Sequence, residues 1–150
     1  MAVGPVLLDT DTLSELSRGN SVATSRARVY LTEFGRFTVS AVTVFERLRG
    51  YRQALRAGKP FNRQLQAFEM LVQNCIVLPF DEDAADLAAT IWSSCSRRQR
   101  QHLGDILIAA IAAARRVVLA TRNTRDFKAL RDASGIELEL TDWTVATKRT

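Results

Sequence analysis

The stretch that decides the fold is Asp105-Ile-Leu-Ile-Ala-Ala-Ile-Ala-Ala-Ala-Arg-Arg-Val-Val-Leu-Ala-Thr-Arg-Asn123. Its first part, residues 105–115, carries apolar side chains on nearly every side, which predicts a helix at the centre of the protein. Its second part, residues 117–120, is short and wholly apolar, as is typical of a strand in a parallel sheet that helices cover on both faces. A buried helix that leads into a buried strand predicts an α/β architecture.

Other short apolar stretches alternate with helical patterns along the rest of the chain. The predicted strands are residues 6–8, 37–40, 75–78 and 117–120, with residues 136–140 as a candidate edge strand. The predicted helices are residues 11–18, 21–34, 42–57, 61–74, 82–99, 105–115 and 124–132. No linker or repeat divides these elements, so we expect a single domain over residues 1–150, with a short, mainly parallel central sheet covered by helices.

The composition excludes several classes of protein. With 150 residues, 47% of them hydrophobic, and a mean hydropathy of −0.06, the chain is neither collagen-like, disordered nor a small disulfide scaffold. No apolar run approaches the ~20 residues of a membrane helix, and the N-terminus does not resemble a secretory signal, so we expect a cytoplasmic protein without a membrane partner. Cys75 and Cys95 fit no paired metal spacing and are predicted to be reduced packing residues.

The net charge of the chain favours a partner that carries phosphate groups. The net charge is +5 and the pI is near 9.9; only three of the 21 basic residues are lysine, so 18 are arginine. The planar guanidinium matches two phosphate oxygens at once, which favours a phosphate-rich partner. A basic pI also occurs in proteins that bind no nucleic acid, so charge alone leaves both interpretations open.

Acidic side chains stand where the predicted elements begin. In an open parallel sheet, groups beyond the carboxyl ends of the strands converge on one crevice, which makes Asp9 and Glu46 predicted neighbours. Asp105 opens the buried helix, and sequence geometry alone does not place it in the crevice. Asn123 and Asp126 follow the fourth strand.

Each acid also has a purely structural interpretation. Thr12-Leu-Ser-Glu15 and Thr43-Val-Phe-Glu46 both spell a capping box, and Asp105 suits the first turn of a helix. Clustered carboxylates nevertheless repel one another, and a hard cation such as Mg²⁺ between them relieves that repulsion. An acidic pit in a basic protein therefore predicts a metal-dependent phosphodiesterase.

Four segments, in this order, resemble PIN-domain ribonucleases of the VapC toxin type. They are Leu7-Leu-Asp-Thr-Asp11, Ser40-Ala-Val-Thr-Val-Phe-Glu-Arg-Leu-Arg-Gly50, Asp105 followed by Ile108-Ala-Ala110, and Ala120-Thr-Arg-Asn-Thr-Arg-Asp-Phe127. The resemblance implies a PIN-like three-layer sandwich in which Asp9, Glu46 and Asp105 bind Mg²⁺ or Mn²⁺. It also implies an endoribonuclease that hydrolyses RNA with a metal-activated water, acts as the toxin of a toxin–antitoxin pair, forms a homodimer and is blocked by a small antitoxin protein.

The fourth position of the family's site maps onto Asn123, where many members carry aspartate. Asn123 can offer a carbonyl oxygen but no charge, so we assign it to the edge of the site. Asp126 is assigned to the first turn of the following helix, with an exchange of the two roles left open.

Two other functions compete with this interpretation. The segment Val6-Leu-Leu-Asp-Thr-Asp-Thr-Leu13 also fits the first motif of haloacid-dehalogenase-type phosphatases, but the lysine and the later acidic pair that such enzymes need are not evident. The second alternative is a non-catalytic nucleic-acid-binding domain whose acids act only as helix caps.

Two groups of basic residues are candidates for contact with RNA. Arg49, Arg52 and Arg56 share one helical face, for which a solvated surface is the favoured interpretation. Residues 97–102 form a predicted basic loop beside Asp105, for which a substrate clamp is favoured. His102, the only histidine, has no metal-ligand spacing and is predicted to lie on the surface.

Overall fold

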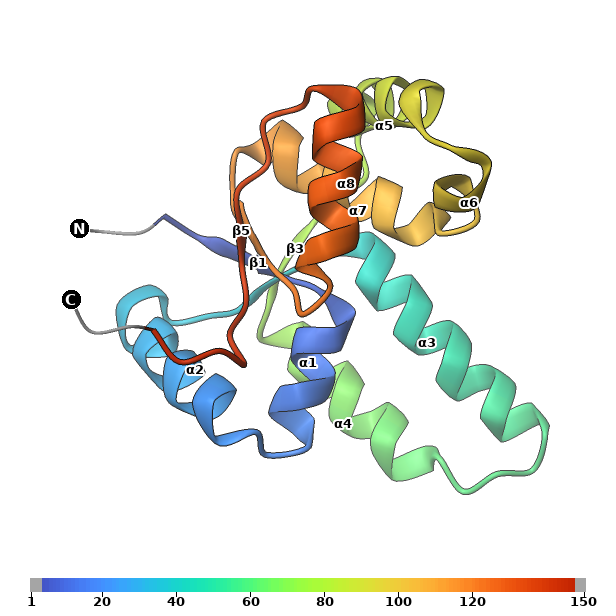
Figure 1. Cartoon of the computed structure of the whole chain (residues 1–150). Coiled ribbons are helices and arrows are strands. Elements are labelled where there is room, and N and C mark those ends of the chain that lie inside the picture. Colours follow the sequence, from blue (N-terminus) through green and yellow to red (C-terminus); the bar gives the residue numbers. More distant parts are fainter. Residues whose placement is uncertain (1–3, 148–150) are drawn as a thin grey trace.

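The protein, in a computed structural model that describes residues 4–147, is built around one five-stranded sheet (Figure 1). The strands are β1 (Val6–Leu8), β2 (Thr38–Ser40), β3 (Ile76–Leu78), β4 (Val118–Ala120) and β5 (Leu140–Thr141). They lie in the order β3-β2-β1-β4-β5, and every neighbouring pair is parallel. The expected α/β fold with a parallel central sheet is confirmed.

Helices connect the strands and cover both faces of the sheet. They are α1 (Thr10–Ser17), α2 (Ser21–Phe34), α3 (Ala41–Arg56), α4 (Asn62–Gln73), α5 (Glu82–Ser94), α6 (Arg97–Arg100), α7 (Leu103–Arg115) and α8 (Thr124–Ser134). Within the described residues, no helix combines the length and the apolar character that crossing a membrane requires.

The central strand β1 divides the core into two layers because successive side chains point to opposite faces. Leu7 packs in one cluster with α5, α7 and α8, whereas Val6 and Leu8 pack in a second cluster with α1 and α2. The helix α7 is buried along most of its length, as its sequence predicts. This arrangement is a three-layer sandwich.

The two cysteines and the last tryptophan take part in this packing. Cys95 is buried in the first cluster and Cys75 packs against the second, and both are free thiols. Trp143 is buried 5.5 Å from the ring of Tyr30 and holds the C-terminal segment against α2.

Three expectations about the elements are wrong in detail. The helix predicted over 82–99 is interrupted at Cys95, whose extended backbone separates α5 from α6; the basic loop is therefore mainly a short helix, capped by Ser96 and Gln99. The edge strand expected at 136–140 contributes only Leu140, because pairing with β4 begins there. The strand β3 is not buried: it lies at the sheet edge, where Ile76 is 48% exposed.

Candidate metal centre

Asp9 and Thr121 face each other at the carboxyl edge of the sheet. Leu8 of β1 is in register with Ala120 of β4, so the residues that follow these strands emerge side by side. The backbone N–H of Asp9 donates to the carbonyl of Ala120 at 2.9 Å and continues the ladder by one step. The Asp9 side chain also caps α1 by accepting from the N–H of Thr10 at 2.8 Å. Asp9 is therefore fixed at both its backbone and its side chain.

The hydroxyl of Thr121 connects Asp9 to Asp11. Its Oγ1 lies 2.9 Å from Oδ2 of Asp9 and 3.3 Å from Oδ2 of Asp11, and it accepts the N–H of Asn123 at 3.0 Å. Because a hydroxyl has one hydrogen to donate, it bonds one carboxylate at a time. Asp11 is held further by the N–H of Arg122 at 3.1 Å.

Glu46 reaches the same edge from the second turn of α3. The N-cap of this helix is Ser40, whose Oγ accepts the N–H of Thr43 at 3.0 Å, so the capping box expected at Thr43 and Glu46 is wrong. The first box is wrong as well, since Asp9 caps α1. Because Glu46 does not cap its own helix, its Oε1 can lie 3.4 Å from the hydroxyl of Thr10.

Gly104 makes room for the Glu46 carboxylate. A Cβ on Gly104 would lie 2.8 Å from Oε2 of Glu46, a distance that real Cβ atoms do not tolerate. The observed position of the Glu46 carboxylate thus depends on the absence of a side chain at residue 104, a role that no local sequence pattern indicates.

Asp105 follows in the first turn of α7, and the structure brings it to the same edge. It lines a cavity of about 330 Å³ together with Glu46. It also lines a second cavity, of about 310 Å³, together with Asp126. Asp105 therefore stands between two hollows that open beside the acidic residues.

Burial and mutual repulsion raise the pKa values of two of these acids. Burial and then the charge of Asp11 raise the pKa of Asp9 from 3.8 to about 7. Burial also raises the pKa of Asp105 to about 6; His102 opposes this increase, and Glu46 and Asp126 add to it. We call Asp9, Asp11, Glu46, Asp105 and Asp126 the acid cluster.

The donor chemistry of the acid cluster fits a hard divalent cation. Its members offer only carboxylate oxygens, and within the described residues none of them forms an ion pair with arginine or lysine. No three such side chains between residues 4 and 147 are already close enough to hold an ion as they stand. A cation would therefore have to draw the carboxylates together, and in doing so it would offset the repulsion that raises their pKa values.

Asn123 and Asp126 take different positions around the acid cluster. Asn123 is the N-cap residue of α8, but its side chain forms no capping hydrogen bond. Asp126 is exposed, and its carboxylate shares a cavity with Asp105. The structure thus brings Asp126 nearer to the predicted ligands than its assignment to a first-turn role implies.

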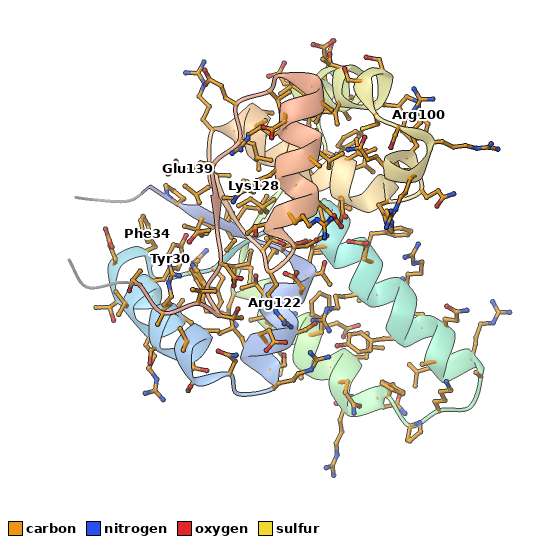
Figure 2. All side chains as sticks on the ribbon, in the orientation of Figure 1. Tyr30, Phe34, Arg100, Arg122, Lys128 and Glu139 are labelled. Atoms are coloured by element: carbon orange, nitrogen blue, oxygen red, sulfur yellow. The ribbon has the colours of Figure 1, made fainter. Side chains whose placement is uncertain are left out.

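Several arginines near the site already have partners. Arg122 pairs with Glu15 at 2.8 Å and lies beside α1 in Figure 2. Arg100, labelled at α6 in the same view, lies over the ring of Trp92 at 5.1 Å and donates to its carbonyl. Arg47 ties α3 to α1 through a 2.6 Å bond to Ser14. These arginines organise the protein around the acid cluster without neutralising it.

Comparisons with known proteins agree with the fold described above. The sequence model described as the PIN domain matches residues 6–133. A search of curated proteins gives no match. A chain in the structure of DNA-bound VapBC from Salmonella typhimurium has a TM-score of 0.70 at 22% identity and covers 93% of this chain and 98% of that one.

Two further solved structures share the fold. A chain of VapBC-1 from nontypeable Haemophilus influenzae has a TM-score of 0.74 at 22% identity, with 95% of this chain and 100% of that chain covered. A chain of FitAcB from Neisseria gonorrhoeae has a TM-score of 0.67 at 26% identity, with 89% and 96% covered. The family match replaces the dehalogenase-type alternative. With the acid cluster at the carboxyl edge of a parallel sheet and a family match over most of its length, the chain belongs to the PIN domain family.

Proposed function

We propose that the protein is a Mg²⁺- or Mn²⁺-dependent endoribonuclease, with Asp9, Glu46 and Asp105 as the residues that hold the metal. The observation that carries the proposal is the acid cluster itself: the pKa of Asp9 is raised to about 7, and that of Asp105 to about 6, in a chain of net charge +5. Strongly perturbed acids that lie close together mark a candidate functional site, and Asp105 also lines two cavities. PIN domains are generally nucleases, which supports hydrolysis of a phosphodiester.

The side chains around the ligands orient them for this reaction. Thr121 donates to Asp9, and the hydroxyl of Thr10 lies within hydrogen-bond distance of Glu46, so a neighbouring hydroxyl orients each of these two ligands. When bound, the metal supplies positive charge to a phosphate oxygen and lowers the pKa of a water for in-line attack. Asn123 is proposed to orient water or substrate at the edge of the site. The chain needs no nucleophile of its own.

Cleavage of mixed RNA with and without metal tests the proposal. We expect cleavage in Mg²⁺ or Mn²⁺ that stops in excess chelator, and a loss of at least ~100-fold for Asp9→Asn, Glu46→Gln or Asp105→Asn. The control is Asp132→Asn, because Asp132 is a surface acid that pairs with the neighbouring Arg131. RNA binding without cleavage, at equal affinity in all these variants, would instead support a non-catalytic binding domain.

A toxin role extends the proposal to partners. The matched folds occur in VapBC and FitAcB complexes, which supports a small antitoxin that places an arginine in the acid cluster. Growth inhibition on expression is expected to disappear with Asp9→Asn and with co-expression of the antitoxin. An RNA substrate inside the cell also implies a cytoplasmic location.

A homodimer is the proposed assembly. Phe45 is 59% exposed and Leu103 is 49% exposed, and both line the cavity between α3 and α7. An exposed apolar face of this kind favours contact with a second copy. Sedimentation of the purified protein measures the assembly directly, and a monomer at all concentrations would contradict it.

A further inference from the structure

A cavity of about 310 Å³ adjoins the acid cluster on the side of α6 and α8. Arg98 of α6 and Arg125 of α8 contribute its basic side chains, and His102 stands at its rim before α7. Ala129 and Leu130 add an apolar surface. We call this hollow the α6–α8 cavity. Its size is within the range of ligand-binding pockets.

The two arginines of the α6–α8 cavity are unpaired among the residues that the structure describes. Within residues 4–147, the guanidinium groups of Arg98 and Arg125 form no ion pair with an acid and no hydrogen bond. By contrast, Arg100 is occupied by Trp92 and Arg122 by Glu15. The donors of Arg98 and Arg125 are therefore available to an anion in the α6–α8 cavity.

The short helix that carries Arg98 is held in a defined orientation. Ser96 and Gln99 form a reciprocal capping box, with bonds of 3.2 Å and 2.8 Å. Arg100 anchors the end of the same helix to α5 through its 3.1 Å bond to the carbonyl of Trp92. The fixed turn holds the backbone of Arg98 beside the cavity, so binding of a ligand has to order only the side chain and not the backbone.

Asp105 and Asp126 belong both to the α6–α8 cavity and to the acid cluster, so an anion held by the arginines lies next to the proposed reacting phosphate. We propose that the α6–α8 cavity binds the RNA nucleotide adjacent to the scissile phosphate. Arg98 and Arg125 donate to its phosphate oxygens, and Ala129 and Leu130 contact its sugar or base. This inference rests on the proposed ribonuclease function, and it names the residues that hold the substrate beside the metal ligands.

Binding measurements in chelator test the subsite without requiring catalysis. The probe is a fluorescein-labelled single-stranded RNA of mixed sequence, and the readout is its anisotropy on titration with protein at several salt concentrations. We expect Arg98→Gln and Arg125→Gln each to raise the Kd roughly 5- to 10-fold and to reduce the salt slope by about 0.7, the value for one phosphate contact on a single strand. The matched control is Arg97→Gln, on the same helix but outside the cavity, with an expected change below twofold. Equal effects at positions 97, 98 and 125, or no RNA binding by the unmodified protein, would overturn the proposal.

A second measurement locates the phosphate. RNAs that carry a single neutral methylphosphonate linkage, moved one position at a time, should reveal one linkage whose neutralisation weakens binding to the unmodified protein but not to Arg98→Gln or Arg125→Gln. The absence of such coupling at every position would reject a phosphate contact by these arginines. Cleavage in Mg²⁺ separates the two proposals. Coupling between a linkage and the two arginines without cleavage supports the subsite and contradicts the nuclease. Cleavage without such coupling supports the nuclease and contradicts the subsite.

Discussion

Replacing Asp9 by asparagine is expected to stabilise the metal-free protein at high pH. The unfolded chain ionises Asp9 near its ordinary pKa of 3.8, whereas burial and Asp11 raise the folded value to about 7. The folded state therefore binds more protons between pH 4 and pH 7, so stability falls as the pH rises through this window. Above pH 7 the full difference corresponds to ~4 kcal/mol of destabilisation relative to a neutral side chain.

Asparagine can keep most of the hydrogen bonds of Asp9. Its carbonyl oxygen can still accept the N–H of Thr10, and its amide can donate to Oγ1 of Thr121. The Thr121 hydroxyl is then free to donate to Asp11, which lies 3.3 Å away. The pKa of about 7 already includes the effect of both hydrogen bonds on the charged carboxylate, so a net gain of a few kcal/mol, at most ~4 kcal/mol, is expected at pH 8.

Urea unfolding in excess chelator, followed from pH 5 to pH 8, measures this effect. Asp9→Asn should gain stability over the unmodified protein as the pH rises and level off above pH 7. The matched control is Asp126→Asn, since Asp126 is exposed, and its stability should change by less than ~0.5 kcal/mol. Mg²⁺ should reverse the order by stabilising only the protein that retains Asp9. A difference between the two proteins that is constant with pH, or that grows toward pH 5, would refute the reasoning.

The remaining predictions concern the space and the charge around the ligands. Gly104→Ala should displace the Glu46 carboxylate and lower the rate of cleavage on the order of tenfold or more, while the free energy of unfolding stays level or rises by up to ~1 kcal/mol. The control is Gly50→Ala in α3, where a Cβ would have nothing within 4 Å; this variant should raise stability without loss of activity. Asn123→Asp should tighten Mn²⁺ binding in calorimetry and Asn123→Ala should lower cleavage in part, because a carboxylate adds charge that the amide lacks. Asp126→Asn should reduce cleavage less than Asp9→Asn; equal damage in a folded protein would make Asp126 the fourth acid.

The buried parts of the fold are those that the sequence predicts well. The strands β1 and β4 are wholly apolar, and the helix α7 is apolar over residues 106–114, so this signal lies within a few consecutive residues. The convergence of Asp9 and Glu46 follows from the topology of a parallel sheet alone. The positions of Asp9 and Glu46 at the sheet edge support the proposal that they bind a metal ion.

Local patterns mislead where the end of an element is set elsewhere. Both apparent capping boxes fail because each helix begins directly after a strand, where Asp9 and Ser40 take the cap. The break after Ser94 could be suspected only from the Ser96 and Gln99 pair, which is itself a capping box.

Other members of the site depend on contacts between distant parts of the chain. Asp11 meets Thr121 across 110 positions, and its spacing of two from Asp9 is the only local signal. The role of Gly104 follows from the approach of α3, which no pattern around residue 104 encodes. Asp126 was noticed in the sequence, but its place beside Asp105 depends on how α8 packs against α7.

In the part of the chain that the structure describes, the acid cluster carries carboxylates without paired arginines, although the chain as a whole is basic. A protein with 18 arginines could neutralise five carboxylates readily, yet within residues 4–147 its nearby guanidinium groups are directed elsewhere: Arg18 and Arg122 pair with Glu15, and Arg47 donates to Ser14. Burial without a positively charged partner disfavours the charged form of Asp9 and costs stability when that form is present. Such an arrangement is useful only when positive charge arrives from outside the chain. The proposed metal ion and a basic side chain of the proposed antitoxin would both supply this charge, so these two ligands should exclude each other at the acid cluster.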